Sequence, residues 1–300
     1  MTLTDDRSNE VGEASPKLER QALRHESWRG FLHAVPAYVY LIVFFVLPLI
    51  IVFVFSFASR GRTGRPMLED WNVDSWGRIT EPLVRTIVTR SLFIAIINTV
   101  FCLVVGYAFA YWIATRPKQS TRTLMLILVL IPFWSNFLVR TYAWRMLLDS
   151  DGYITQLGEL TGLWGRTLFT LPAVFLGLLY GYLPFMVLPL YAAIERIDWS
   201  VVEAARDLYA SGTRAFWHVT LPLSRPGIIA GSILVFIPSL GAYVTPDILG
   251  GAKTTLLGNF IVSQFGSARN WPFGSALSGA ILIVMLVGTI LYFRTGGRTV

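Results

Sequence analysis

Cysteine, histidine and charged residues are all scarce in this chain of 300 residues. The single cysteine, Cys102, excludes an intrachain disulfide and a cysteine-based metal cluster. The three histidines, His25, His33 and His218, lack the spacing of metal ligands, so we expect no metal site. Charged residues make up 14% of the chain and hydrophobic residues 54%, whereas about a quarter of an average soluble domain is charged. The composition therefore indicates a membrane protein.

The formal net charge of +7 does not by itself predict a nucleic-acid partner. The Lys and Arg residues are dispersed among the polar connections instead of forming one basic stripe. Such a distribution is typical of side chains that face water or lipid headgroups. We therefore expect no nucleic acid among the partners.

Six apolar stretches are long enough to cross a bilayer as helices, which takes about 20 residues each. They are Phe31–Ala58, Ser91–Ala114, about Thr123–Val139, Leu168–Ile194, about Gly227–Val244 and Ala276–Phe293. Residues 1–30 are polar and show no apolar core followed by a cleavage site, so we interpret them as a cytoplasmic tail. The sequence predicts an all-α membrane protein with six transmembrane helices in a domain covering residues 31–300, and both termini on one side.

The distribution of Lys and Arg among the predicted loops orients the chain only weakly. With the N-terminus inside, the inside segments hold slightly more of these residues than the outside segments. The loop 59–90 opposes this assignment because it is outside yet rich in arginine, although it also carries acids and is long enough to fold on itself. The charges therefore favour cytoplasmic termini only slightly.

Polar and small residues within the spans predict contacts between helices. Asn98 and Thr99 lie mid-span, and we expect them to form hydrogen bonds with other helices. Glycines such as Gly106 would let neighbouring helices approach closely. Glu195 lies at the inner end of the fourth span beside Arg196, and a structural pairing is the better interpretation of it than transport chemistry.

A charged, alanine-rich segment, EAARDLYASGTRAFWHVTLPLSRPG, separates the fourth and fifth spans. Ser200 with Glu203 three residues later matches a capping box, which predicts a helix beginning there. Gly212 is expected to end or bend this helix, and Pro222 and Pro226 prevent a smooth continuation into the next span. Apolar residues recur along it at spacings of three and four, at Val201, Ala205, Leu208, Gly212, Ala215 and Val219. The segment is thus predicted to be an amphipathic helix that lies across the membrane face.

Three interpretations of this helix differ in what covers its polar face. An interfacial anchor would favour a face rich in Lys and Arg, whereas Glu203 and Asp207 here offset the basic residues. A helix in a solvated loop would need no partner. A docking helix would present small alanines to the groove of a partner protein. Periodicity alone leaves these alternatives open.

The segment resembles the EAA loop of the permeases of ATP-binding-cassette (ABC) importers. The pattern of that family is E-A-A, then a glycine four residues after the second alanine, and later I-x-L-P. Tyr209 stands at the position of the glycine, which is a departure, and Gly212 is expected to supply the bend instead. The residues that match are Glu203, Ala204, Ala205, Leu221 and Pro222, with Val219 in place of the isoleucine.

Two further stretches, LIPFWSNFLVRTYAWRMLL at 130–148 and residues 250–274, resemble the permeases of spermidine/putrescine importers. The resemblance implies the type I ABC importer fold, with a cytoplasmic coupling helix in a loop of about 196–225, in the bacterial inner membrane. It also implies a second related permease, cytoplasmic ATPase subunits and a periplasmic substrate-binding protein as partners. In this family the EAA helix docks in a cleft of the ATPase. The docking residues it implies are Glu203, Ala204, Ala205, Asp207, Gly212, Leu221 and Pro222.

The segment GGAKTT at 250–255 is the nearest match to a phosphate-binding loop, and it lacks both glycines that the Walker pattern requires. No Ser-His-Asp arrangement is suggested either. We therefore interpret the chain as non-catalytic and without a cofactor of its own, with ATP bound by the partner subunits.

A path for a polyamine should offer carboxylates for its charges and aromatic faces for cation–π contacts. Asp247, with Tyr243 one turn before it, is the first candidate, although Asp247 could instead cap the segment after Pro246. Further candidates for the path lie around the third span, although an aromatic belt at the membrane interface is the better interpretation of them, since Trp and Tyr favour interfaces. These candidates are Trp134, Tyr142 and Trp144.

Other functions remain open from the sequence. An ABC permease for an opine, an iron complex or sulfate is the nearest, although an anion would be better served by basic groups in the path. A stand-alone secondary transporter or channel is less favoured because the chain shows no duplicated halves. An assembly scaffold without transport is the third alternative.

Overall fold

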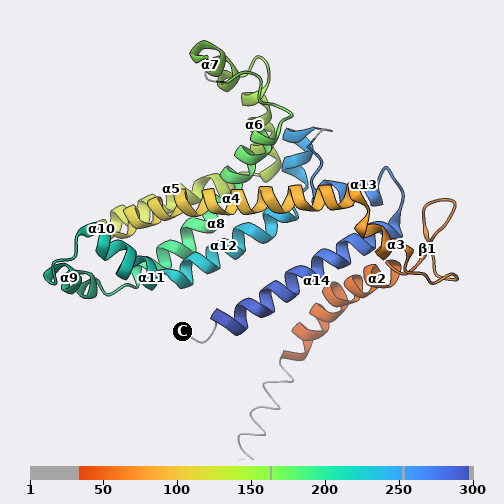
Figure 1. Ribbon diagram of the computed structural model, residues 1–300, viewed down its shortest axis with the longest axis horizontal. Helices are drawn as coiled ribbons and strands as arrows, with labels where there is room; N and C mark the ends of the chain where they lie inside the picture. Colours follow the sequence, from red (N-terminus) through yellow and green to blue (C-terminus); the bar gives the residue numbers. More distant parts are fainter. Residues whose placement is uncertain (1–33, 163, 252–253, 297–300) are drawn as a thin grey trace, which may run out of the picture. The chain divides into compact units, whose positions relative to one another are not determined.

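The computed structural model describes residues 34–162, 164–251 and 254–296 (Figure 1). The chain divides into two units, residues 1–54 and 55–300. The helix Ala34–Phe55 accounts for the described part of the first unit and reaches the boundary between the two. It contains a π-helical turn, η1 (Ile42–Val46), followed by α2 (Leu47–Phe55). The predicted cytoplasmic tail, residues 1–30, lies outside the described residues.

The second unit is helical apart from one short hairpin, which confirms the predicted all-α class. Proline occupies the first turn of the two long helices that begin at Pro82 and Leu171, where the absence of its N–H costs no hydrogen bond. Its elements in chain order are β1 (Ser59–Arg60), β2 (Pro66–Met67), α3 (Asp74–Gly77), η2 (Arg78–Thr80), α4 (Pro82–Ala114), α5 (Gln119–Trp134), α6 (Phe137–Leu148), α7 (Tyr153–Thr161), α8 (Leu171–Glu195), α9 (Trp199–Asp207), α10 (Gly212–Ala215), η3 (Phe216–Thr220), α11 (Leu221–Leu223), α12 (Arg225–Leu240), η4 (Pro246–Gly250), α13 (Leu257–Phe265) and α14 (Trp271–Gly296).

The core of this unit is built by α4, α8 and α12, which pack against one another in all three pairs. Met186 of α8 lies at their meeting point and is fully buried. A Cβ atom added to Gly106 of α4 would lie 2.9 Å from Met186 Cγ, and one added to Gly231 of α12 would lie 2.7 Å from its sulfur. The close approach predicted for Gly106 is therefore real, because these glycines make room for one large side chain.

Polar contacts inside this core confirm one sequence prediction and correct another. The buried Asn98 donates from Nδ2 to Ser239 Oγ at 2.9 Å, which ties α4 to α12 as expected. Thr99 instead donates to the carbonyl of Ala95, one turn back in its own helix, at 2.7 Å. A threonine hydroxyl in a helix has this local acceptor always within reach, so Thr99 needs no partner on another helix.

Four helices in the described part of the chain are long and apolar enough to cross a membrane, and two bent pairs raise the number to six if each pair is one span. The predicted third span is one of these pairs and is not continuous. It breaks after Trp134, and α5 and the following helical segment (residues 137–161) meet at 88°. The break has a local cause, because Asn136 accepts a hydrogen bond from the amide of Leu138 at 2.8 Å and so begins a new helix.

The predicted ends of two other spans also shift. The second was expected to begin at Ser91, yet α4 begins at Pro82 and is about 50 Å long at 1.5 Å per residue. The sixth begins at Trp271 instead of Ala276. At one end of α4 lie α3 and the hairpin, and at its other end lie α9, α10 and α11 (Figure 1). The arginine-rich loop and the charged insert therefore occupy opposite ends of the bundle, as the predicted topology requires.

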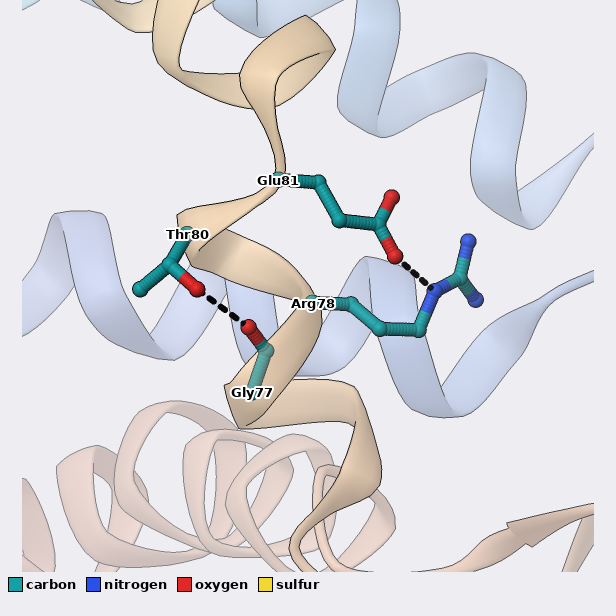
Figure 2. A network of polar contacts seen from close by, with 4 residues as sticks. All are labelled: Gly77, Arg78, Thr80 and Glu81. Carbon is teal, nitrogen blue, oxygen red and sulfur yellow. Dashed lines mark hydrogen bonds and ion pairs between the residues drawn. The ribbon is translucent and has the colours of Figure 1, made fainter.

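The arginine-rich loop is folded on itself. Its short strands pair antiparallel, and Arg60 donates to the carbonyl of Ala268 at 2.8 Å. Figure 2 shows the contacts that follow, in which Arg78 Nε donates to Glu81 at 3.0 Å and Thr80 donates to the carbonyl of Gly77 at 2.7 Å. The guanidinium of Arg78 also lies 4.3 Å from the ring centre of Phe273. Arg60 and Arg78 thus hold this loop against α14 and the segment just before it.

Candidate functional site

The charged insert forms a loop of short helices at one end of the bundle, running from α9 through α10 and η3 to α11. We call residues 196–225 the docking loop. Its first helix begins at Trp199, because the carboxylate of Asp198 accepts a hydrogen bond from the amide of Ser200 at 3.0 Å. The hydrogen bonds from Ser200 also hold the pKa of Asp198 below its usual value. The predicted capping box of Ser200 and Glu203 is therefore wrong, and Asp198 is the cap.

The buried face of α9 is shifted by one residue from the predicted apolar stripe, because Val202 and not Val201 faces the bundle. Val202 is buried against the bundle, whereas Val201 is 47% exposed and Leu208 is 82% exposed. The stripe was misplaced because the helix packs on the bundle through Val202 and ends at Asp207, before Leu208. Of the predicted docking residues, Ala205 is half-buried and the other three of this helix, Glu203, Ala204 and Asp207, are exposed. The helix thus presents a free face that carries two acids, one base (Arg206) and a small alanine.

The end of α9 has the hydrogen bonds of a Schellman motif. The amide of Ala210 donates to the carbonyl of Ala205 at 3.1 Å, and that of Tyr209 donates to the carbonyl of Arg206 at 2.9 Å. Tyr209 has a φ of 61°, which is the left-handed conformation that a glycine usually provides at this position. The predicted role of Gly212 is wrong, since it is the first residue of α10, after the capping residue Ser211.

An aromatic cluster joins the docking loop to the end of α4. It consists of Tyr107 and Tyr111 of α4, Trp199 of α9 and Phe216 of η3. The ring of Phe216 meets those of Tyr107 and Tyr111 edge to face, with centroids 5.5 and 5.8 Å apart, and Trp199 lies 6.3 Å from Tyr111. Sequence reasoning missed this cluster, although two tyrosines four residues apart at the end of a span were a usable signal.

The later part of the docking loop leads directly into α12. Leu221 and Pro222 lie half-buried in the single turn α11. Ser224, which follows this turn, is fully buried and its hydroxyl lies 2.9 Å from that of Tyr107. The segments Gly212–Leu223 and Arg225–Leu240 meet at 65°. The loop is therefore fastened both to α4 and to α12.

Glu195 at the end of α8 is paired, as expected, but with other partners than its charged neighbours. The hydroxyl of Tyr191 donates to its carboxylate at 2.7 Å, and a nitrogen of Arg122 lies 3.8 Å away. Arg122 also donates from Nε to the carbonyl of Arg116 at 2.6 Å. These contacts link the ends of α4 and α8 to the start of α5.

The first pair of path candidates lies beyond the opposite end of α12. The amide of Asp247 donates to the carbonyl of Tyr243 at 3.1 Å, which places the two residues one turn apart, as the sequence suggested. Both side chains are exposed. The Asp247 carboxylate has no hydrogen bond or ion pair with any described residue, so the alternative in which its side chain caps the segment after Pro246 gains no support.

The three aromatic path candidates do not gather at one place. Trp134 at the end of α5 is 84% exposed, and Tyr142 in α6 is 50% exposed. Trp144 is half-buried and meets Tyr180 of α8 edge to face, with ring centroids 5.6 Å apart. Leu249 of η4 lines the same small cavity as Trp144. The structure thus brings Trp144 near the element that carries Asp247, and leaves the other two on exposed surface.

Arg140 also lines the cavity beside Trp144, which the sequence analysis did not anticipate. Its guanidinium lies over the ring of Phe133, 5.1 Å from the centroid, and over that of Phe137 at 5.8 Å. Its Nε is buried and has no hydrogen-bond partner among the described residues. A cationic group therefore lies close to one wall of the candidate path.

Comparison with known proteins gives one family and a set of similar permeases. Residues 92–295 match the family described as the binding-protein-dependent transport system inner membrane component. The chain is 40% identical over 258 residues to the spermidine/putrescine transport system permease protein PotB of Escherichia coli strain K12, covering 85% of this chain and 93% of that protein. PotB of Haemophilus influenzae is 40% identical over 259 residues, with 85% and 90% covered.

Solved structures agree in fold at low sequence identity. A bacterial ABC transporter that imports the acidic polysaccharide alginate aligns with a TM-score of 0.69 and 15% identity, over 93% of this chain and 99% of that chain. The same kind of transporter in complex with an alginate-bound periplasmic protein aligns with a TM-score of 0.69 and 14% identity, over 90% and 96%. These alignments support the importer permease fold.

Proposed function

The chain belongs to the binding-protein-dependent transport system inner membrane component family, and on this premise we propose that it is the permease subunit of an ATP-driven polyamine importer. The observation that supports a polyamine as the substrate is the 40% identity, over most of both chains, to permeases named for spermidine and putrescine. Permeases of this kind are non-catalytic, so the energy comes from ATPase subunits on separate chains. Alternating access would move the polyamine through the bundle.

The docking loop is the proposed contact with the ATPase. Glu203, Ala204 and Asp207 form its free face, and the small alanine would let a partner's groove approach the helix closely. Ala205 and the pair Leu221 and Pro222 are half-buried, so their proposed role is to hold the helix on the bundle. Gly212 is exposed and has open space around it, which suits a residue that a partner covers.

The aromatic cluster would transmit movement of the docking loop to the membrane-spanning helices. When the ATPase subunits close on ATP, they would move α9, and Trp199 would carry this movement to Tyr111 at the end of α4. Phe216 would carry it to Tyr107 in the same helix. The bend between α11 and α12 would pass it on to α12 and so to Asp247 beyond it. Both flexing and rigid-body movement of these helices fit this route.

The remaining partners and the orientation follow from this role. A docking loop that meets a cytoplasmic ATPase lies in the cytoplasm, so both termini would be cytoplasmic and the arginine-rich loop would face the periplasm. A periplasmic binding protein would deliver the polyamine, and a second related permease would complete the path. Asp247 and Tyr243 would offer it a carboxylate and an aromatic face.

One observation favours a different cargo. Arg140, with its unpaired Nε beside Trp144, would suit an anionic solute better than a polycation. The second candidate function is therefore an ABC permease for an anion such as sulfate or an opine. In the polyamine importer Arg140 would lie behind the path, held by Phe133 and Phe137, while Tyr142, Trp134 and Trp144 line its wall or its membrane interface.

Uptake by the reconstituted importer decides between the two cargoes. The complex of both permeases, the ATPase and the binding protein in liposomes should accumulate labelled putrescine and spermidine when ATP is enclosed, and not labelled sulfate. The variant Asp247→Asn should slow polyamine uptake about tenfold or more, since an intramembrane or path-lining charge is usually functional. The control Asp70→Asn, an exposed acid of the arginine-rich loop, should leave uptake unchanged. Uptake of sulfate alone would contradict the polyamine assignment.

A further inference from the structure

Tyr209 has an unusual backbone conformation and an almost fully exposed side chain. It has the left-handed backbone conformation, with φ of 61°, and its side chain is 98% exposed. For any residue except glycine this conformation brings Cβ too close to the backbone, so it costs free energy. A glycine is also what the EAA pattern has here. The tyrosine therefore occupies a position for which the backbone favours another residue.

The backbone itself does not require a tyrosine. Both hydrogen bonds of the Schellman motif come from main-chain amides, of Tyr209 and of Ala210, and a glycine would make them equally well. The loop thus keeps the geometry of the family's glycine while it carries a large side chain. The reason for the side chain must be sought in what the ring contacts.

Within the described residues the ring contacts nothing that would repay this cost. It has no hydrogen bond, no ring pair and no place in a buried cluster, and its neighbour Leu208 is 82% exposed as well. A strained, fully exposed aromatic residue is typical of a functional contact, because the chain alone gains no stability from it. The benefit therefore comes from another molecule.

We propose that Tyr209, together with Leu208, is the anchor that makes the docking loop specific for its own ATPase subunit. This inference rests on the proposed docking function. Leu208 lies one turn after the exposed Ala204, so the pair continues the free face of α9 at its C-terminal tip. Tyrosine is among the residues that most often dominate the binding energy of an interface. The partner should offer an apolar pocket that receives the ring of Tyr209.

Charge argues for a protein partner over the membrane surface. Membrane-binding helices present mainly Lys and Arg to anionic headgroups, whereas the exposed side of α9 beside Tyr209 carries Glu203 and Asp207 with one base, Arg206. This net negative side is not suited to an anionic lipid surface. Its carboxylates would suit a basic rim around the pocket that receives the tyrosine.

Three substitutions separate the ring from the backbone. Tyr209→Gly removes both the ring and the strain, Tyr209→Ala removes the ring but keeps the strain, and Tyr209→Phe keeps both. We expect the glycine and alanine variants to bind the purified ATPase subunit about tenfold or more weakly, as for the loss of an interface anchor, and the phenylalanine variant to bind within about threefold. Tyr209→Gly should at the same time raise the melting temperature of the permease complex, because the strain is relieved. The control Tyr153→Ala, at another exposed tyrosine in α7, should change neither value.

The binding measurement uses both permeases in nanodiscs with the purified ATPase subunit of the same importer. A second measurement uses Tyr209→Cys, since the only natural cysteine, Cys102, is buried. Maleimide should label residue 209 rapidly in the permease pair and at least about tenfold more slowly once the ATPase is bound, as expected for a buried anchor.

The outcomes are distinct. Tight binding by Tyr209→Gly, or rapid labelling at 209 in the presence of the ATPase, would overturn the anchor and leave the docking function intact. Protection of 209 by anionic lipid without ATPase would overturn it in favour of a membrane contact. Failure of the unsubstituted permease pair to bind the ATPase at all would overturn the proposed function itself.

Discussion

Replacing Phe216 with alanine should uncouple the docking loop from α4. Phe216 makes two edge-to-face contacts with this helix, to Tyr107 and to Tyr111. Each such pair contributes about 0.5–1.5 kcal/mol beyond the burial of area, so their loss weakens the attachment by about 1–3 kcal/mol. Since every 1.4 kcal/mol is a factor of ten, this shifts the equilibrium between the attached and detached loop by between about fivefold and more than a hundredfold.

The assay for this uncoupling compares transport with hydrolysis in one preparation. In proteoliposomes that contain the whole importer, the amount of polyamine taken up per ATP hydrolysed should fall at least about fivefold for Phe216→Ala, in keeping with the lower bound of the shift. The ATPase should still copurify, because the free face of α9 is unchanged. The matched control Phe101→Ala removes another edge-to-face pair of α4, with Phe175, 5.1 Å apart and away from the docking loop. An unchanged ratio for Phe216→Ala, or an equal loss for both variants, would refute the role of the cluster.

Three further predictions concern the docking loop and the core. Glu203→Ala should prevent assembly with the ATPase while insertion and melting temperature stay unchanged, and normal uptake would count against the docking assignment. Gly231→Leu should lower the free energy of unfolding of the complex by about 1–3 kcal/mol or more in chemical denaturation, since a Cβ atom alone would lie 2.7 Å from the sulfur of Met186. The control Gly181→Ala should leave it unchanged, because a Cβ atom there would meet no atom within 4 Å. The cap formed by Asp198 has a lowered pKa, so its stabilisation of α9 is present at neutral pH and lost only in acid, as pH falls through that lowered value. The hydrogen-exchange protection factors in the first turn of α9, taken relative to the intrinsic rate at each pH, should fall there and not near pH 6.

The membrane fold could be predicted from the sequence because hydrophobic length is the dominant signal for a spanning helix. The same signal missed the break at Asn136, since two polar residues do not lower the average of a long apolar run. The break depends on one side chain accepting one amide, and averaging over residues does not detect such a bond. The true start of α4 was missed for a related reason, because its first turns are polar and lie outside the apolar stretch.

The docking loop could be identified from its motif, but its faces could not be assigned correctly. The predicted stripe ran through residues 201–219, whereas α9 ends at Asp207 and α10 begins only at Gly212, so its earlier and later members do not share one helix face. The bend was expected at Gly212 because glycine readily adopts the left-handed conformation, whereas Tyr209 adopts it here. Of the two partners of Glu195, Tyr191 is one turn away in the same helix, whereas Arg122 lies far away in sequence and only the packing of the helix ends brings it close.

The path residues were the least predictable part. Tyr243 and Asp247 are joined by local spacing, and the structure keeps them one turn apart. Trp134, Tyr142 and Trp144 are close in sequence, yet the break between α5 and α6 sends them to different surroundings. Their roles as path residues stay predictions, because half of any such path would come from a second permease.

ATP hydrolysis by the complete importer tests the central claim most directly, since it joins the docking loop to the cargo. The complex of both permeases, the ATPase and the binding protein would be measured with and without putrescine, spermidine and a panel of anions. The account predicts that hydrolysis rises with putrescine or spermidine only, and that Glu203→Ala abolishes this rise. Stimulation by an anion alone would contradict the polyamine assignment, and a permease pair that binds no ATPase would contradict the importer itself.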